Sequence, residues 1–304
     1  MAFGATYETV NIFPALQALG HEVMVFPLLN KNLSNNIRPL DCEILDIVKI
    51  TKPDLLIFLE YKGTISPEII RFITEHTNTT TLFIAGDEEK YFNITKHYSP
   101  YVNNMFTTFK PAVAKHQIMG CENVIFGGYY ANDQIYKRYK IPKSLDVSFA
   151  GSRNEPRRIM FNKLTQSGIS VNVFGNGWET GNALNLGEYV MLMNKSKINI
   201  NISIDIINGK EHLQVKGRDF EVPMCGGFLL THKNDELEQF YKQGKEVVVY
   251  TDLDDAVSKI KYYLKHDSER EKIAKAGYAR AHKDHTSLKR WKYILGKCKF
   301  KGGK

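Results

Sequence analysis

The residues best suited to chemistry lie in one stretch, residues 216–230, which reads KGRDFEVPMCGGFLL. Lys216 and Arg218 place two cations where the pattern predicts the start of a short helix. A helix start exposes backbone N–H groups without partners and a partial positive charge, so this position suits a phosphate or diphosphate. Glu221 follows one turn later, where it either accepts hydrogen bonds from sugar hydroxyls or pairs with Arg218 on the helix surface.

Strand-like segments flank this stretch. Residues 198–204 form an expected strand that leads through a polar loop to Lys216, and the stretch itself ends in an apolar run. The predicted order is strand, loop, short helix, glycine turn and strand. The two cations and Glu221 are therefore expected on the loop and the helix between two strands.

A second glycine-containing turn precedes another expected helix. Residues 146–150 are predicted to form a strand, which Gly151, Ser152 and Arg153 follow, with Pro156 in the first turn of the helix. Such a turn brings backbone amides to an anion, and Arg153 adds a charged donor. The alternative is a tight turn that binds nothing.

A third turn follows the strand expected over residues 170–174. It contains Gly175, Gly177 and Trp178. Glycines allow a flat nucleotide base to approach the backbone closely, and an indole ring can line the pocket of that base. We therefore take these three residues as candidates for binding a nucleotide.

Acidic residues follow two expected strands of the first half, at Glu60 and at Asp87. Ligands of open parallel sheets bind beyond the carboxyl ends of the strands, so both acids are candidates to face a substrate. Asp87 is preferred because a glycine precedes it and two acids follow it, as in an open loop. The alternative for Asp87 is a helix cap or a solvated side chain.

Taken with the rest of the chain, residues 216–230 resemble the signature of the GT-B glycosyltransferases of the spore-maturation (CgeB-type) family. In that family a K/R-G-R-x-F-E segment runs into an apolar turn that contains two glycines. Further segments resemble the family in the same order over nearly the whole chain. They are residues 19–23, 146–152, 173–178, 246–250, 262–264 and 285–286.

The resemblance implies an α/β fold of GT-B type. This fold has two Rossmann-like domains whose parallel sheets face each other across a cleft, and a C-terminal helix that crosses back to the first domain. It also implies a sugar nucleotide held mostly by the second domain, with Glu221 at the position of a glutamate that binds the ribose. In related retaining enzymes a second glutamate, eight residues earlier, touches the donor sugar. Leu213 stands there in this sequence, so the donor sugar and the stereochemical outcome stay open.

The length and the composition suit two globular domains. The chain has 304 residues, of which 43% are hydrophobic and 24% charged. We expect an N-terminal domain on the acceptor side over residues 1–143, with a first strand that is short or missing. A nucleotide-sugar-binding domain would follow over residues 144–285, and a crossover helix with a basic tail over residues 286–304.

The sequence also predicts a cytoplasmic protein with reduced thiols. Its longest uninterrupted apolar run, residues 55–59, is too short to cross a bilayer, and the first residues lack the features of a signal peptide. The four cysteines, at positions 42, 121, 225 and 298, form no C-x-x-C pair. This spacing argues against a disulfide framework and against a zinc cluster.

The net charge of +8 is concentrated at the C-terminus. Residues 286–304 hold seven Lys or Arg and no acid, so the rest of the chain has 41 − 7 = 34 basic residues against 33 acidic ones. A basic tail either binds an anionic membrane surface or a polyanion, or is a solvated terminus. The nearly neutral remainder argues against broad nucleic-acid binding.

Together these features predict a glycosyltransferase that moves a sugar from a nucleoside diphosphate sugar, first of all a UDP-sugar, to an acceptor hydroxyl. Lys216, Arg218 and Arg153 would stabilise the leaving diphosphate, and Asp87 would accept the proton of the acceptor or orient it. Neither a metal ion nor a separate cofactor is expected. The D-x-D motif at residues 252–254 lies at an expected helix start, where capping explains it.

The acceptor stays open among a glycan, a small molecule, a protein and modified DNA. Two other functions also stay open. One is a DNA-modifying glycosyltransferase of viral type that acts on hydroxylated bases, which would need a basic face at the acceptor. The other is a non-catalytic sugar-nucleotide-binding or coat-associated protein, which the short N-terminal strand and Leu213 favour.

Overall fold

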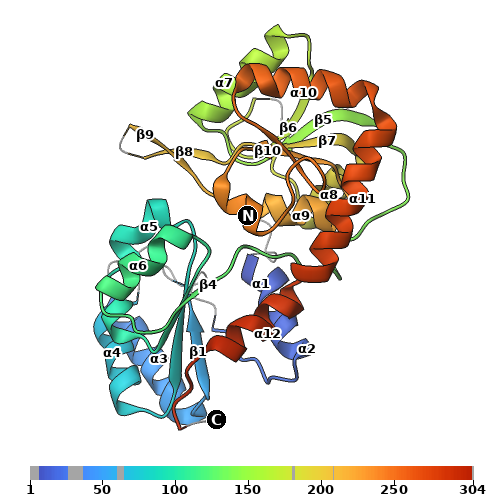
Figure 1. Ribbon diagram of the computed structural model, residues 1–304. Coiled ribbons are helices and arrows are strands. Elements are labelled where there is room, and N and C mark those ends of the chain that lie inside the picture. Colours follow the sequence, from blue (N-terminus) through green and yellow to red (C-terminus); the bar gives the residue numbers. More distant parts are fainter. Residues whose placement is uncertain (1–6, 27–36, 60–64, 180–181, 208, 303–304) are drawn as a thin grey trace. The chain divides into compact units, whose positions relative to one another are not determined.

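The computed structural model describes residues 7–26, 37–59, 65–179, 182–207 and 209–302 (Figure 1). The chain folds into two compact units. Unit 1 comprises Met1–Glu22 and Tyr129–Trp291, and unit 2 comprises Val23–Gly128 and Lys292–Lys304. The chain thus leaves unit 1, builds unit 2, returns to unit 1 and ends in unit 2. Residues 129–143, expected in the first domain, group with unit 1 in this division.

Unit 2 is built on a four-stranded parallel sheet with the order β1-β2-β3-β4. The strands are β1 (Leu55–Phe58), β2 (Thr80–Ala85), β3 (Asn104–Thr107) and β4 (Val124–Phe126). They alternate with helices, as parallel pairing requires. These are α3 (Ile37–Thr51), α4 (Pro67–His76), α5 (Glu88–Thr95), the 3-10 turn η2 (Ser99–Tyr101) and α6 (Lys110–Ile118). Buried residues such as Ile70, Phe83 and Met105 form the core of this unit.

Unit 1 is built on a five-stranded parallel sheet with the order β11-β10-β7-β5-β6. Its strands are β5 (Leu145–Ala150), β6 (Val171–Phe174), β7 (Ser196–Asn201), β10 (Leu229–His232) and β11 (Val248–Tyr250). The connecting elements are α7 (Glu155–Gln166), α8 (Leu186–Lys195), α9 (Arg218–Met224), the 3-10 helix η3 (Asp235–Gln239), α10 (Leu253–Lys265) and α11 (Asp267–Asp284). Phe149, Ile198 and Leu230 lie in the core of this unit.

The first helices of the chain, α1 (Tyr7–Asn11) and α2 (Phe13–Ala18), also belong to unit 1. The buried side chain of Asn11 accepts a hydrogen bond from the Asn132 backbone N–H at 2.8 Å, and Asn132 Nδ2 donates to the Val10 carbonyl at 2.8 Å. Residues 7–18 thus form two short helices instead of one continuous helix. The hydrogen-bond partner of these helices, Asn132, lies more than a hundred residues away in sequence.

An antiparallel hairpin interrupts unit 1 ahead of the signature stretch. Its strands, β8 (Ile204–Ile207) and β9 (Lys210–Leu213), extend away from the parallel sheet (Figure 1). The strand expected over residues 198–204 is therefore wrong in its extent, because β7 ends at Asn201 and residues from Ile204 on belong to the hairpin. Leu213 is the last residue of β9, and its side chain is exposed.

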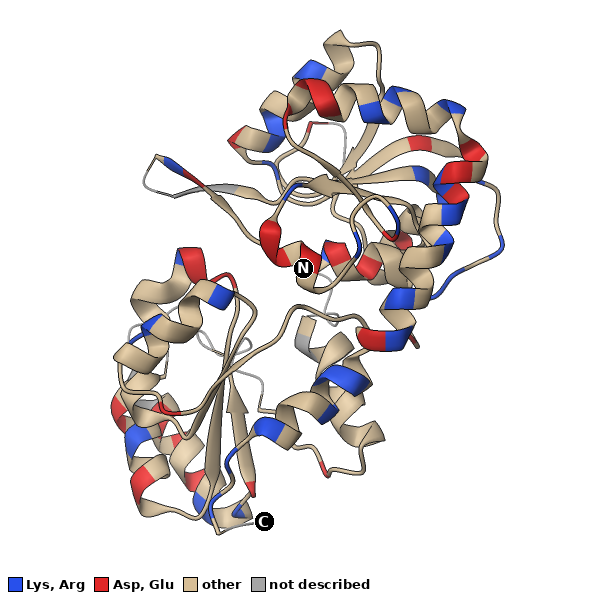
Figure 2. Cartoon of the chain, in the orientation of Figure 1, with Lys and Arg blue, Asp and Glu red and all other residues tan. Residues whose placement is uncertain are grey.

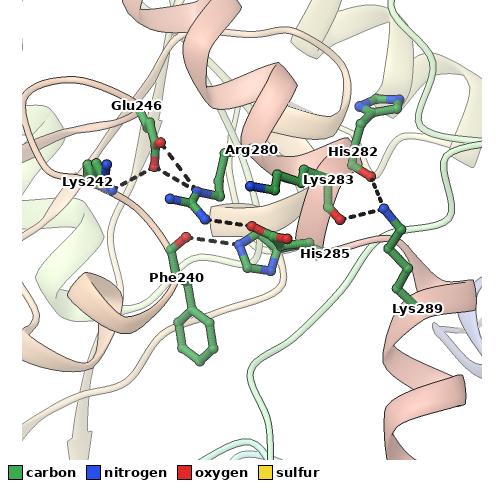
Figure 3. A network of polar contacts seen from close by, with 9 residues as sticks. Phe240, Lys242, Glu246, Arg280, His282, Lys283, His285 and Lys289 are labelled. Carbon is green, nitrogen blue, oxygen red and sulfur yellow. Dashed lines mark hydrogen bonds and ion pairs between the residues drawn. The ribbon is translucent and has the colours of Figure 1, made fainter.

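A polar network fixes the end of α11 (Figure 3). Arg280 Nε donates to Glu246 Oε2 at 3.2 Å and its Nη1 donates to Asp284 Oδ2 at 2.6 Å. Next to it, the buried His285 donates from Nε2 to the Phe240 carbonyl at 3.0 Å. Lys289, in the first turn of α12 (Ser287–Lys297), donates to carbonyl oxygens of α11. The turn between the two helices is thereby tied to the loop that precedes β11.

The basic tail is held by unit 2. Helix α12 begins in unit 1 and ends in unit 2, in line with the C-terminal helix that the resemblance implied. After it, the Lys299 N–H donates to Asn104 Oδ1 at 2.7 Å, and the Lys301 N–H donates to Thr80 Oγ1 at 3.0 Å. Lys301 Nζ also donates to the Thr77 carbonyl at 2.9 Å. Figure 2 shows this terminal segment as mostly basic, next to helices that carry both signs. Binding of a membrane surface or a polyanion stays a prediction.

The apolar and β-branched residues 22–28 favour a strand, but residues 22–26 are irregular. Residues 27–28 and the first residues of the chain lie outside the described residues. Ser268 and Glu271 have the spacing of a capping box, which predicts a helix start at Ser268, but they form no such box here. Helix α11 begins at Asp267, and its N-cap residue, His266, makes no side-chain capping bond. Within the described ranges, no helix combines the length and the apolar character that a membrane span needs.

Candidate active site

Arg218, the first residue of α9, is fixed against the carboxyl ends of two strands. Its Nε donates to Asn201 Oδ1 at 2.9 Å, and its Nη1 donates to the Ala150 carbonyl at 2.5 Å. Ala150 ends β5 and Asn201 ends β7. The guanidinium carbon also lies 4.9 Å from the centre of the Phe149 ring, a cation–π distance. Arg218 is therefore a preorganised positive charge at the carboxyl edge of the sheet, the edge at which open parallel sheets bind their ligands.

Asp219, which the sequence did not single out, anchors the start of the same helix. It is buried and accepts hydrogen bonds from the Lys216 backbone N–H at 2.9 Å, from Asn201 Nδ2 at 2.7 Å and from Thr231 Oγ1 at 2.8 Å. Burial raises the pKa of its carboxyl, and these three hydrogen bonds and the charge of Arg218 oppose that shift. An acid in the first helical turn was the signal available in the sequence.

Lys216 lies beside this anchor. Its backbone N–H is taken by Asp219, while its ammonium donates to Gln214 Oε1 at 3.3 Å. The structure thus brings Lys216 and Arg218 to the same helix start, as the spacing predicted. The short helix, the glycine turn and the following strand β10 of that prediction are confirmed.

Glu221 is buried, and two tyrosines hold its carboxylate. Tyr136 Oη donates to Oε1 at 3.2 Å and Tyr189 Oη donates to Oε2 at 2.7 Å. Burial raises the pKa of Glu221, while the two hydroxyls and the charge of Arg218 lower it. The surface pair with Arg218 considered from the sequence is therefore wrong. Each carboxylate oxygen keeps acceptor capacity beyond its one tyrosine.

The turns after β5 and β6 meet at this edge because their glycines lack side chains. A β-carbon at Gly151 would lie 2.6 Å from Arg218 Nη1, and one at Gly175 would lie 2.3 Å from the Gly151 carbonyl oxygen. Trp178 Nε1 donates to that same carbonyl at 2.8 Å, and its ring packs 5.2 Å from that of Phe161. The structure therefore brings Gly151, Gly175 and Trp178 next to Arg218.

Gly177 and Arg153 are linked across the same two turns. The Arg153 N–H donates to the Asn176 carbonyl at 2.9 Å, and a β-carbon at Gly177, whose φ is +84°, would lie 3.2 Å from Arg153 Cβ. Ser152 and Arg153 are exposed. Helix α7 follows with Asn154 as N-cap, whose side chain accepts from the Arg157 N–H at 3.1 Å, and with a proline in its first turn. The predicted proline is confirmed, and the cap at Asn154 was missed.

Asp87 belongs to unit 2, directly after β2. It takes the N-cap position of α5 with a left-handed backbone (φ +45°, ψ +43°), and its side chain makes no capping hydrogen bond. Capping by its side chain is therefore not its role in this structure. Left-handed backbone is costly for a non-glycine residue, and such outliers concentrate at functional sites. Glu60, the second candidate, lies outside the described residues.

The D-x-D motif caps a helix, as predicted. Asp252 is the N-cap of α10, and its Oδ1 accepts from the Asp255 N–H at 2.9 Å. Within the described part of the chain, no group of three His, Cys, Asp or Glu residues is placed to hold a metal ion. The cavity next to Arg218 has a volume of about 10 Å³, close to that of one water molecule.

Comparison with known proteins finds one matching family model and several similar solved structures. Residues 153–296 match a family model described as glycosyl transferase-like, whereas no curated protein matches the sequence. HepE of Anabaena, solved with UDP and glucose, has a TM-score of 0.68 at 12% identity, over 93% of this chain and 88% of that one. Sucrose-phosphate synthase of Thermosynechococcus elongatus has a TM-score of 0.63 at 9% identity, over 90% and 82%. A glycosyltransferase of Rickettsia africae has a TM-score of 0.63 at 12% identity, over 93% and 86%.

Identities this low establish the fold alone, and that fold is GT-B with two parallel sheets, as predicted from the sequence. The family model adds the enzyme class, and its matched segment includes Arg153, Lys216, Arg218 and Glu221. The finer assignment to the CgeB-type family stays a prediction. The chain therefore has a GT-B fold, and its glycosyl transferase-like segment, residues 153–296, contains the Arg218 site.

Proposed function

We propose that this enzyme transfers a sugar from a nucleoside diphosphate sugar, a UDP-sugar, to an acceptor hydroxyl without a metal ion. The observation that carries the proposal is the Arg218 guanidinium, fixed by Ala150 and Asn201 at a sheet edge cleared of side chains by Gly151 and Gly175. A structural neighbour, HepE, has been solved with UDP-glucose, which supports this class of donor.

The chemistry asks mainly for charge stabilisation. The bond between the anomeric carbon and the diphosphate oxygen breaks, the acceptor oxygen bonds to that carbon, and negative charge grows on the diphosphate. Fixed positive groups that meet this charge lower the barrier without reorganising. Arg218 and Lys216 are assigned this task, and Arg153 adds a further cation on the neighbouring turn.

The remaining residues bind the two substrates. Glu221 accepts hydrogen bonds from the ribose, and Gly175, Gly177 and Trp178 form the turn that faces the base. Asp87 orients the acceptor hydroxyl or takes its proton, and in a retaining reaction the leaving phosphate takes that proton instead. The left-handed backbone of Asp87 is the observation that supports a role beyond helix capping.

The test is an assay of donor cleavage. The full chain is incubated with radiolabelled UDP-glucose, UDP-galactose and UDP-N-acetylglucosamine, each with magnesium and with excess chelator, and released UDP is separated by chromatography. Release that persists with chelator and fails in Arg218→Ala supports the proposal. The control is Arg158→Ala, which removes an exposed arginine paired with Glu155 on α7. Release that needs magnesium would exclude the metal-independent mechanism, and no release from any of the three donors would exclude the proposed activity toward them.

A second arm addresses Asp87. Asp87→Asn keeps the size of the side chain and removes its negative charge. We expect transfer to an acceptor to be lost while binding of UDP is kept, since donor binding is assigned to unit 1. Wild-type turnover in this variant would remove Asp87 from the site.

A further inference from the structure

A cavity of about 360 Å³ lies in unit 1 and shares no lining residue with the candidate site. Its walls are residues 138–143, the turn residue Gly226 after α9, and Glu271 of α11. The segment 138–143 is the coil that runs past α11 on its way to β5 (Figure 1). The volume is that of a typical small-molecule site, which spans about 300–1,000 Å³.

The lining is strongly basic. Arg138, Lys140 and Lys143 contribute three cations, whereas Glu271 is the one acid of the lining. Glu271 Oε1 also lies 3.8 Å from Arg270 Nη2, so part of its negative charge is offset by Arg270. The cavity therefore has an excess of about two positive charges, and an anion is the ligand that this excess favours.

Lys143 shows the cost of leaving this charge unbalanced. Burial lowers the pKa of its ammonium, Glu271 opposes that shift, and the nearby Arg138 and Arg270 add to it. A cation that is both partly buried and repelled by its neighbours gains from a bound anion. Lys143 is thus the side chain to which an anion in this cavity would matter most.

The basic wall is held in place rather than loose. The buried Asn194 of α8 accepts from the Tyr139 N–H at 2.7 Å and donates to the Lys137 carbonyl at 2.9 Å. Gly226 admits the Arg138 side chain, because a β-carbon there would lie 2.8 Å from Arg138 Cδ. The Arg138 guanidinium also lies 5.8 Å from the ring of Tyr278. Both the backbone and the main cation of the wall are therefore preorganised.

We propose that this cavity binds a small organic phosphate monoester. A monoester carries about two negative charges at neutral pH, which matches the excess in the lining. Arg138 and Lys143 contact the phosphate, and Tyr139, Ile141 and Pro142 offer an apolar wall to the organic part. The site is independent of the sugar nucleotide site proposed above.

The probes are inorganic phosphate and phenyl phosphate, titrated by calorimetry into the full chain in phosphate-free buffer. We expect both to bind saturably in the micromolar to millimolar range, with phenyl phosphate the tighter. Arg138→Met with Lys143→Met should weaken binding at least about tenfold, since each charged hydrogen bond contributes about that factor or more. The single variant Lys143→Arg keeps the charge and should therefore retain most of the wild-type affinity.

A matched control makes the result specific. Arg158→Met with Lys163→Met removes the same charge from the surface of α7 and should leave binding unchanged. If the wild type shows no saturable binding, or if the control pair weakens binding as much as the cavity pair, the proposal is overturned. Should the double variant fail to fold, the exposed Arg138→Met variant carries the same test.

Discussion

The carbonyl oxygen of Gly151 lies so close to Gly175 that a β-carbon at position 175 would be 2.3 Å from it. Real β-carbons do not approach this closely, so only glycine fits where the turn after β6 passes the turn after β5. The same carbonyl accepts from the Trp178 indole, and a β-carbon on Gly151 would meet Arg218. The carboxyl ends of β5 and β6, where we propose that the donor binds, thus depend on glycines without side chains as much as on charged residues.

Gly175→Ala is expected to lower the free energy of unfolding by about 3 kcal/mol or more, since it adds a backbone collision to an unfavourable φ of +134°. Gly168→Ala is the matched control. Its φ of +78° is also unfavourable, but no atom lies within 4 Å of the added carbon, so a loss of about 1–2 kcal/mol is expected. Urea unfolding of both variants measures the difference, and equal losses would contradict the collision.

Arg218→Ala is expected to weaken UDP binding by about 1.5–3 kcal/mol, the contribution of hydrogen bonds to a charged group. The substitution also removes the contacts of Arg218 with Ala150 and Asn201, so thermal unfolding must be measured beside calorimetry. Arg158→Ala serves as control, because it removes an exposed arginine of unit 1. A folded Arg218→Ala protein that binds UDP with wild-type affinity sinks the assignment.

Glu221→Gln is expected to lose binding of uridine and UDP alike, because both contain the ribose. Tyr189→Phe tests the same site through pH. Its hydroxyl stabilises the ionised carboxylate, so its removal raises the pKa of Glu221, and binding that needs the carboxylate should then fail at a higher pH than in the wild type. The measurement is UDP affinity from neutral to acidic pH. Superimposable profiles would exclude an ionised Glu221 from binding.

Because His285 is buried, we expect the protein to lose stability in acid. Burial lowers the pKa of His285 to about 4 from the ordinary 6.5, so the unfolded chain binds a proton that the folded chain resists. The stabilisation is complete above pH 6.5 and is lost as the pH falls from 6.5 to about 4, by about 3 kcal/mol at most. His285→Gln keeps a donor for the Phe240 carbonyl without titrating. Urea unfolding across this window should show the wild type losing more stability than the variant, and parallel losses would contradict the role of His285.

The sequence predicted the parts of the site that are local. Glycines after apolar strands and a cation pair at a helix start depend on near neighbours, so the pattern predicted Gly151 and Gly175 at strand ends and Arg218 at a helix start. The partners of Glu221 were not, because Tyr136 and Tyr189 lie 85 and 32 residues away in sequence. Nothing in a single sequence shows which tyrosines the tertiary fold will bring to a carboxylate.

For the fold, too, local features were predicted and features that depend on distant residues or neighbouring elements were not. Strands β5 and β10 were predicted from short apolar runs, whereas β7 was extended too far because the hairpin β8–β9 continues the same β-branched pattern. The capping box at Ser268 failed because α10 ends at Lys265 and α11 already begins at Asp267. A favourable local motif has no effect when the preceding helix leaves no room for it.

The route of the chain, which crosses between unit 1 and unit 2 three times, limits how such enzymes can exchange parts. A chimera made by joining two relatives at one point, such as Tyr129, would separate Asn132 from its partners in Val10 and Asn11. It would also take the last residues, which hydrogen-bond Asn104 and Thr80, from a different parent than the sheet they contact. Recombination that transplants the whole of unit 1 therefore needs three matched junctions. Chimeras with a single junction are expected to lose these hydrogen bonds and to be less stable.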